Sequence, residues 1–105
     1  METVLRALAD PTRLAILRLV RDRERTAGQI AERFPVTPSA ISQHLAVLAG
    51  AGLLARRREG TRRLYRARPE GLRELRAFLE GFWDQGLDAL KRAVEAEARR
   101  DRRRG

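Results

Sequence analysis

With 105 residues, the chain is long enough for one domain with a single modest core. It contains no cysteine, which excludes disulfides and thiolate metal sites, and no apolar run near the ~20 residues that a membrane span requires. No signal-peptide pattern opens the chain, so we expect a cytoplasmic protein.

The net charge of +9 is concentrated in one part of the chain. Residues 1–36 carry 7 arginines against 5 acidic residues, and residues 69–105 carry 9 basic against 8 acidic residues. Residues 37–68 carry 7 arginines against Glu59 alone. A positive excess confined to one block favours a polyanionic partner, whereas an evenly spread excess would indicate only solubility.

Two helices are predicted at the start of the chain. Residues 2–9 form a short amphipathic pattern, with apolar side chains on one side at Val4, Leu5 and Leu8. Asp10 is a suitable N-cap for the next helix, and Pro11 fits its first position. The apolar content of this second helix, which continues to Val20, indicates that most of it is buried.

Two further capped helices follow a polar connection at residues 21–25. Thr26 and Gln29 have the spacing of a capping box, which begins a helix expected to continue through Phe34. The second helix covers residues 37–50, with buried positions at Ile41, Leu45 and Leu48. Two capped helices joined by a short break indicate a helix-turn-helix over residues 26–50.

A β-hairpin is predicted at residues 54–68, behind the second of these helices. Gly60–Thr61 is a Gly-X pair that suits a type II′ turn, and a two-residue loop there would pair Glu59 with Arg62. We therefore expect one domain over residues 1–105, mainly α with a small β-hairpin: a winged helix-turn-helix that is dimeric through its terminal helices.

A long helix is predicted over residues 70–99, followed by a basic tail at residues 99–105. Its apolar stripe is longer than one core of this size needs, so we expect it to pack on the same helix of a second copy. The expected dimer-interface residues are Val4, Leu5, Leu8, Leu79, Phe82, Trp83, Leu87 and Leu90. Trp83 has an alternative role in lining an effector pocket, and the tail is either a solvated end or a supplementary phosphate-binding arm.

The helix at 37–50 has the composition of a helix that enters a major groove. It carries no charged side chain, and its start offers short hydrogen-bonding groups suited to base edges. The expected base-reading residues are Thr37, Ser39, Ser42, Gln43 and His44. The expected contacts to the DNA backbone or minor groove are Arg56, Arg57, Arg58, Arg62 and Arg63. For His44, a structural role and a metal-ligand role are the alternatives.

Three segments within residues 4–68 read "ALADPTRLAILRLV", "VTPSAISQHLAVLAGAGLL" and "RREGTRRLYR". Together they resemble the ArsR/SmtB family of winged-helix transcriptional repressors. Tyr65 matches the wing of that family, and the signature of its recognition helix matches at Ser42, His44, Leu45, Leu48, Gly52 and Leu53. The resemblance implies a homodimer that blocks transcription and leaves its operator when a signal arrives. The effector itself is unknown.

One departure from the family bears on metal sensing. Metal-sensing members carry a Cys-x-Cys pair where this chain has Thr26, Ala27 and Gly28, and His44 is the only histidine. Because one imidazole without thiolates makes a poor site for a borderline metal, no metal site and no cofactor are expected. The segment "FWDQGLDALK" resembles a metal-independent subgroup.

We therefore expect a sequence-specific transcriptional repressor that binds an inverted-repeat operator as a homodimer. The main alternative is an architectural protein that binds DNA without sequence preference. An enzyme is disfavoured because no catalytic constellation is visible around a single histidine. A protein-interaction winged helix is disfavoured by the acid-free helix beside a basic wing.

Overall fold

The computed structural model describes residues 1–104, apart from the side chains of Phe82, Trp83 and Arg104. The chain forms two compact units, the first covering Met1–Leu75 and the second beginning at Arg76. The elements in chain order are α1 (Glu2–Leu8), α2 (Pro11–Leu19), β1 (Arg25–Thr26), α3 (Ala27–Ala31), α4 (Pro38–Gly50), β2 (Leu54–Glu59), β3 (Arg62–Ala67) and α5 (Pro69–Arg104).

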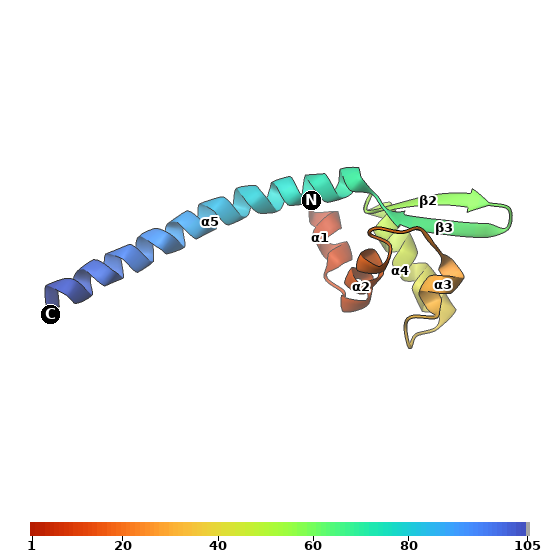
Figure 1. The fold of residues 1–105 in the computed structure, drawn as a ribbon, viewed down its shortest axis with the longest axis horizontal. Coiled ribbons are helices and arrows are strands. Elements are labelled where there is room, and N and C mark those ends of the chain that lie inside the picture. The colour runs from red at the N-terminus through yellow and green to blue at the C-terminus, as the bar shows by residue number, and fades with distance from the viewer. Residues whose placement is uncertain (105) are drawn as a thin grey trace. The chain divides into compact units, whose positions relative to one another are not determined.

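The core of the first unit lies between its helices and the base of its sheet. Apolar residues from α1, α2, α3 and α4 meet there with the segment that leads into β2, and the side chains with at most 1% exposure are Ala7, Ile16, Val20, Ile30, Ile41, Leu45, Leu48 and Leu53. Figure 1 shows β2 and β3 extending as one hairpin away from the helices α1–α4. The predicted buried side of the helix at 37–50 is confirmed.

The predicted starts of α2 and α3 are confirmed by their caps. One carboxylate oxygen of Asp10 accepts hydrogen bonds from the backbone N–H groups of Thr12 (2.8 Å) and Arg13 (3.1 Å). The capping box is complete, because Thr26 and Gln29 each accept a hydrogen bond from the other's backbone N–H.

The helix expected through Phe34 is shorter than predicted, because α3 ends at Ala31. After that residue the backbone turns by i→i+3 bonds, from Arg33 N–H to Ile30 and from Phe34 N–H to Ala31. Pro35 disfavours helical geometry at Phe34, the residue before it, so the helix could not have included that residue.

Helix α4 stops at a Schellman motif centred on Gly52. The Leu53 N–H bonds to the Leu48 carbonyl and the Gly52 N–H to the Ala49 carbonyl, both at 3.0 Å. Gly52 has φ of 77°, a left-handed conformation that a residue with a side chain rarely adopts. This stop turns the chain from the end of α4 directly into the wing.

The sheet has three antiparallel strands in the order β1-β3-β2, one more than the predicted hairpin. The hairpin itself has the expected register, with Glu59 opposite Arg62. Gly60 has φ of 63° and no described non-glycine residue has a positive φ, the combination expected for a type II′ turn. The additional strand β1 consists of Arg25, the last residue of the expected polar connection, and the capping residue Thr26, which pairs with Leu64.

Helix α5 extends beyond the predicted range of 70–99 at both ends. It begins at Pro69 and continues to Arg104. The segment expected as a basic tail at residues 99–105 is therefore helical as far as Arg104. Two properties explain this extension: arginine is a good helix former, and cations are favourable at a helix C-terminus. None of the helices in the described part of the chain has the length and apolar character that a bilayer crossing requires.

Candidate nucleic-acid interface

The outer face of α4 is exposed and uncharged. Thr37, which caps the helix through a hydrogen bond from Ala40 N–H (3.1 Å), is exposed together with Ser39, Ser42 and Gln43. These four of the five predicted base-reading residues lie on the side of α4 that does not face the core. They offer hydroxyl and amide groups, which match the mixed donors and acceptors of base edges.

His44, the fifth predicted reader, lies apart from this face and is half-buried. Its ring Nδ1 is 3.3 Å from Nη1 of Arg13, a residue of α2. This contact supports the structural role among the alternatives for His44. In the described part of the chain, no three His, Asp or Glu side chains gather as a potential ligand set for a metal ion.

The arginines of the wing differ in whether they are paired with carboxylates. Residues directly opposite one another in antiparallel strands share a face, so Arg58 lies beside Arg63, and Arg56 lies on the same face beside Tyr65. Within the described residues, Arg56, Arg58 and Arg63 form no ion pair, and neither does Arg62 on the opposite face. Two adjacent guanidinium groups without a carboxylate repel each other, and a phosphate between them would remove that repulsion.

Arg57, on the other face of the wing, is already occupied by protein carboxylates. Its Nε and Nη2 donate to the two oxygens of Glu24, each at 2.7 Å, and Nη2 also lies 3.0 Å from Glu59. The hydrogen bonds from Arg57 lower the pKa of the Glu24 carboxyl and, in return, raise the pKa of Arg57. A DNA contact at Arg57 stays a prediction; in the structure its guanidinium joins the wing to the segment before β1.

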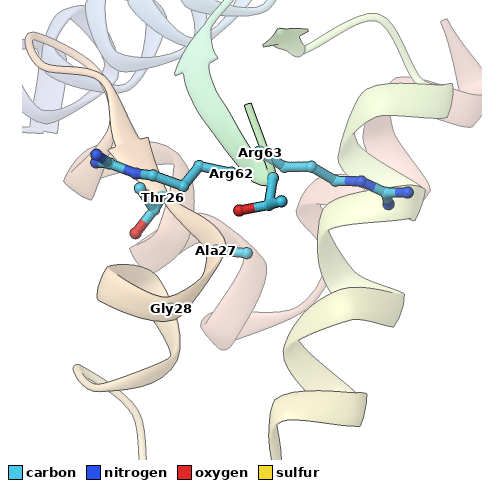
Figure 2. Close-up of a pocket in the computed structure, with 6 residues that line it drawn as sticks. Thr26, Ala27, Gly28, Arg62 and Arg63 are labelled. Carbon is cyan, nitrogen blue, oxygen red and sulfur yellow. The ribbon is translucent and has the colours of Figure 1, made fainter. Parts of the chain in front are cut away.

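The predicted arginines at the turn, Arg62 and Arg63, point in opposite directions from β3 (Figure 2). They border a shallow hollow of about 450 Å³ that is also lined by Thr26, Ala27, Gly28 and Thr61. The three residues that replace a Cys-x-Cys pair therefore lie beside the wing, and they provide one hydroxyl and no soft ligand.

The predicted dimer-interface residues fall into three groups. Val4 and Leu8 are partly buried against the core of the first unit, whereas Leu5 is 41% exposed. Leu79, Leu87 and Leu90 on α5 are exposed. The side chains of Phe82 and Trp83 lie outside the described residues.

Two exposed residues on the outer face of α4 were not predicted from the sequence as part of the interface. Ala46 and Val47 are exposed, and Val47 is 44% open to solvent although it is a large apolar residue. Exposed apolar groups on such a helix suit contact with the methyl group of thymine. The available signal was their distance from the buried stripe, since neither residue lies three, four or seven positions from Ile41, Leu45 or Leu48.

A helix-turn-helix with an uncharged exposed helix and an arginine-rich wing defines a class of DNA-binding proteins. Comparison with known proteins agrees, because a model of a helix-turn-helix domain matches residues 8–57. The HTH-type transcriptional regulator Rv2034 of Mycobacterium tuberculosis is 41% identical over 91 residues, which cover 87% of this chain and 85% of that protein. The transcriptional repressor SdpR of Bacillus subtilis is 42% identical over 60 residues, covering 57% of this chain and 67% of that protein.

A solved structure described as a possible transcriptional regulator for arsenical resistance superposes with a TM-score of 0.75. It shares 42% sequence identity, and the match covers 86% of this chain and 93% of that one. The chain belongs to the ArsR/SmtB family of winged helix-turn-helix transcriptional regulators. It is thus a DNA-binding regulator of transcription, from a family that is not enzymatic.

Proposed function

We propose that this protein is a homodimeric repressor that reads an inverted-repeat operator through α4. The observation that carries the proposal is the exposed, uncharged polar face of α4 together with a wing face on which Arg56, Arg58 and Arg63 pair with no carboxylate among the described residues. The first can distinguish bases and the second can hold phosphates, which are the two separate tasks of a sequence-specific binder. The Bacillus subtilis relative is named a transcriptional repressor, which supports repression of transcription by this protein.

The dimer is supported by the apolar residues on α5. Phe78, Leu79, Leu87, Leu90 and Val94 are each between 42% and 60% exposed, and contiguous exposed apolar groups usually mark an interface. We propose that this stripe and Leu5 pack against a second copy, with Val4, Leu8, Phe82 and Trp83 contributing to the same contact. The two α4 helices would then enter successive major grooves about 34 Å apart.

Selection of bound sequences from random DNA tests the proposal as a whole. We expect an inverted repeat with half-site centres about 10 base pairs apart, bound roughly 10³-fold more tightly than random DNA. Equal binding to all sequences would favour the alternative, an architectural DNA-binding protein. A stable monomer in sedimentation at micromolar concentration would contradict the proposed dimer.

Metal independence is a separate proposal. Although the solved structure is described in terms of arsenical resistance, this chain has no cysteine and one histidine, whose Nδ1 faces Arg13. Operator affinity should therefore change by less than about twofold with zinc, cadmium, nickel or arsenite at constant ionic strength. A roughly tenfold loss of operator affinity at micromolar metal would contradict the proposal. It would show that carboxylates form a metal site, because the chain has no soft ligand.

The two faces of the wing predict different salt dependences for two substitutions. Arg63→Ala should weaken operator and random DNA alike, and should reduce the slope of log affinity against log salt by about one unit. Arg57→Ala should change that slope much less, since this guanidinium is bound to Glu24 and Glu59.

Fluorescence anisotropy at several salt concentrations measures both slopes on the same two DNAs. Arg57→Ala is the matched control, because it removes the same charge from the same hairpin. Equal changes in slope for the two variants would contradict the assignment of phosphate contacts to the face of Arg56, Arg58 and Arg63.

A further inference from the structure

We propose that Arg13 is a positioning residue for DNA recognition, which fastens α4 to the end of α1 through His44. The inference rests on the proposed function, because it assumes that α4 reads the operator. It assigns a role to the only histidine in the chain that involves neither a metal nor a base.

The guanidinium of Arg13 binds acceptors on two other helices at once. Its Nε donates to the carbonyl of Ala7 at 2.6 Å and its Nη2 to the carbonyl of Arg6 at 3.1 Å. Its third nitrogen, Nη1, lies 3.3 Å from Nδ1 of His44 on α4. The planar group holds several donors in a fixed arrangement, which a lysine ammonium does not reproduce.

On the side of α1, Arg13 meets a need created by the end of the helix. The carbonyls in the last turn of a helix lack donors from a following turn, and those of Arg6 and Ala7 belong to that turn. The Arg6 carbonyl also accepts a bond from the Ala9 N–H at 3.2 Å, so Arg13 is a second donor there and serves mainly the carbonyl of Ala7. Ala7 is 1% exposed, so its side of the helix is closed to solvent. A cation at this position also interacts favourably with the helix dipole.

On the side of α4, the contact involves one particular ring nitrogen of His44. An arginine has no hydrogen-bond acceptor, so the imidazole accepts the bond at Nδ1. His44 directly follows the proposed reader Gln43, so this bond lies one residue from the reading face.

A directional bond at this point adds something that the core contacts of α4 do not provide. The helix is otherwise held by Ile41, Leu45 and Leu48, and apolar burial has no preferred direction. Such contacts resist separation more strongly than a small rotation of the helix about its axis. Because base recognition requires side chains to be placed within about 0.5 Å, a bond that limits rotation increases specificity.

A matched pair of substitutions at His44 in the full-length protein tests the inference. In His44→Asn the side-chain oxygen takes the place of Nδ1, whereas in His44→Gln the amide reaches the place of Nε2. We expect His44→Asn to keep operator affinity within about twofold and His44→Gln to lower it about tenfold, since a bond to a charged donor is lost. Binding to random DNA should hardly change in either variant. The reverse ranking would overturn the inference, because it would show that His44 reads bases through Nε2.

Arg13→Lys provides a second test that keeps the net charge. It should lower operator affinity about tenfold and leave affinity for random DNA unchanged, and its combination with His44→Gln should be no worse than the more damaging single substitution. Thermal unfolding of each variant, with binding measured well below its midpoint, separates this effect from loss of the fold. Additive losses would overturn the inference.

The failure of this inference can be distinguished from the failure of the proposed function. If the wild-type protein prefers its operator and Arg13→Lys and His44→Gln keep that preference in full, only the role of Arg13 is wrong. If the wild-type protein binds all DNA alike, the proposed function fails and this inference fails with it.

Discussion

Gln43→Ala is expected to weaken binding to the operator by about 1–3 kcal/mol and binding to random DNA by much less. The exposed amide of Gln43 lies on the outer face of α4, and a glutamine amide can form two hydrogen bonds with adenine. Alanine is the stronger helix former, so the substitution should not destabilise the helix. The loss should therefore appear as reduced specificity, measured by fluorescence anisotropy on both DNAs.

The matched control is Gln85→Ala, which removes an exposed glutamine from α5. It should leave binding to both DNAs unchanged. If Gln43→Ala weakened operator and random DNA equally, α4 would not be the reading helix, and the architectural alternative would be favoured.

Gly71→Ala is expected to destabilise the first unit by about 1–3 kcal/mol, although alanine normally stabilises a helix. Gly71 is buried in the first turn of α5, where that turn meets the chain reversal after α4. A Cβ atom there would overlap the carbonyl oxygen of Gly52, and it would lie 3.0 Å from the carbonyl carbon and 3.5 Å from Cα of Leu53. These are backbone atoms of a Schellman motif, so they cannot move without disturbing the end of α4.

Gly81→Ala, in the same helix, is the control for this prediction. A Cβ atom at Gly81 would have no described neighbour within 4 Å, so the ordinary preference for alanine should stabilise the protein by about 0.5–1 kcal/mol. Urea unfolding of the two variants should therefore give opposite shifts in the midpoint. A stabilising effect of Gly71→Ala would show that the first turn of α5 is free to move away from Gly52.

The elements that the sequence predicted well are those specified by local chemistry. The caps at Asp10, Thr26 and Thr37 each depend on a side chain within three residues of its donor, so their spacing is visible in the sequence. The hairpin register likewise follows from the two-residue loop at Gly60–Thr61. The buried stripe of α4 follows from helical periodicity alone.

The features that were missed depend on contacts between distant segments. The strand β1 has two residues, too few for a periodic pattern, and it exists because β3 lies beside it. Arg57 resembles its neighbours in the sequence, and only the fold brings Glu24, 33 positions away, to its guanidinium. His44 meets Arg13 across 31 positions, so no local pattern indicated this contact.

The pairing of Arg58 with Arg63 has a consequence for the motions of the wing. The hairpin is anchored at its base by the buried residues Leu54 and Ala67, whereas these two like charges repel each other near its exposed end. Amide hydrogens near the turn should therefore exchange through local opening, while those at the base should exchange only when the whole unit unfolds. Salt should slow exchange near the turn in the free protein because it screens the repulsion. Bound DNA should slow it further, because phosphates would then lie between the two guanidinium groups.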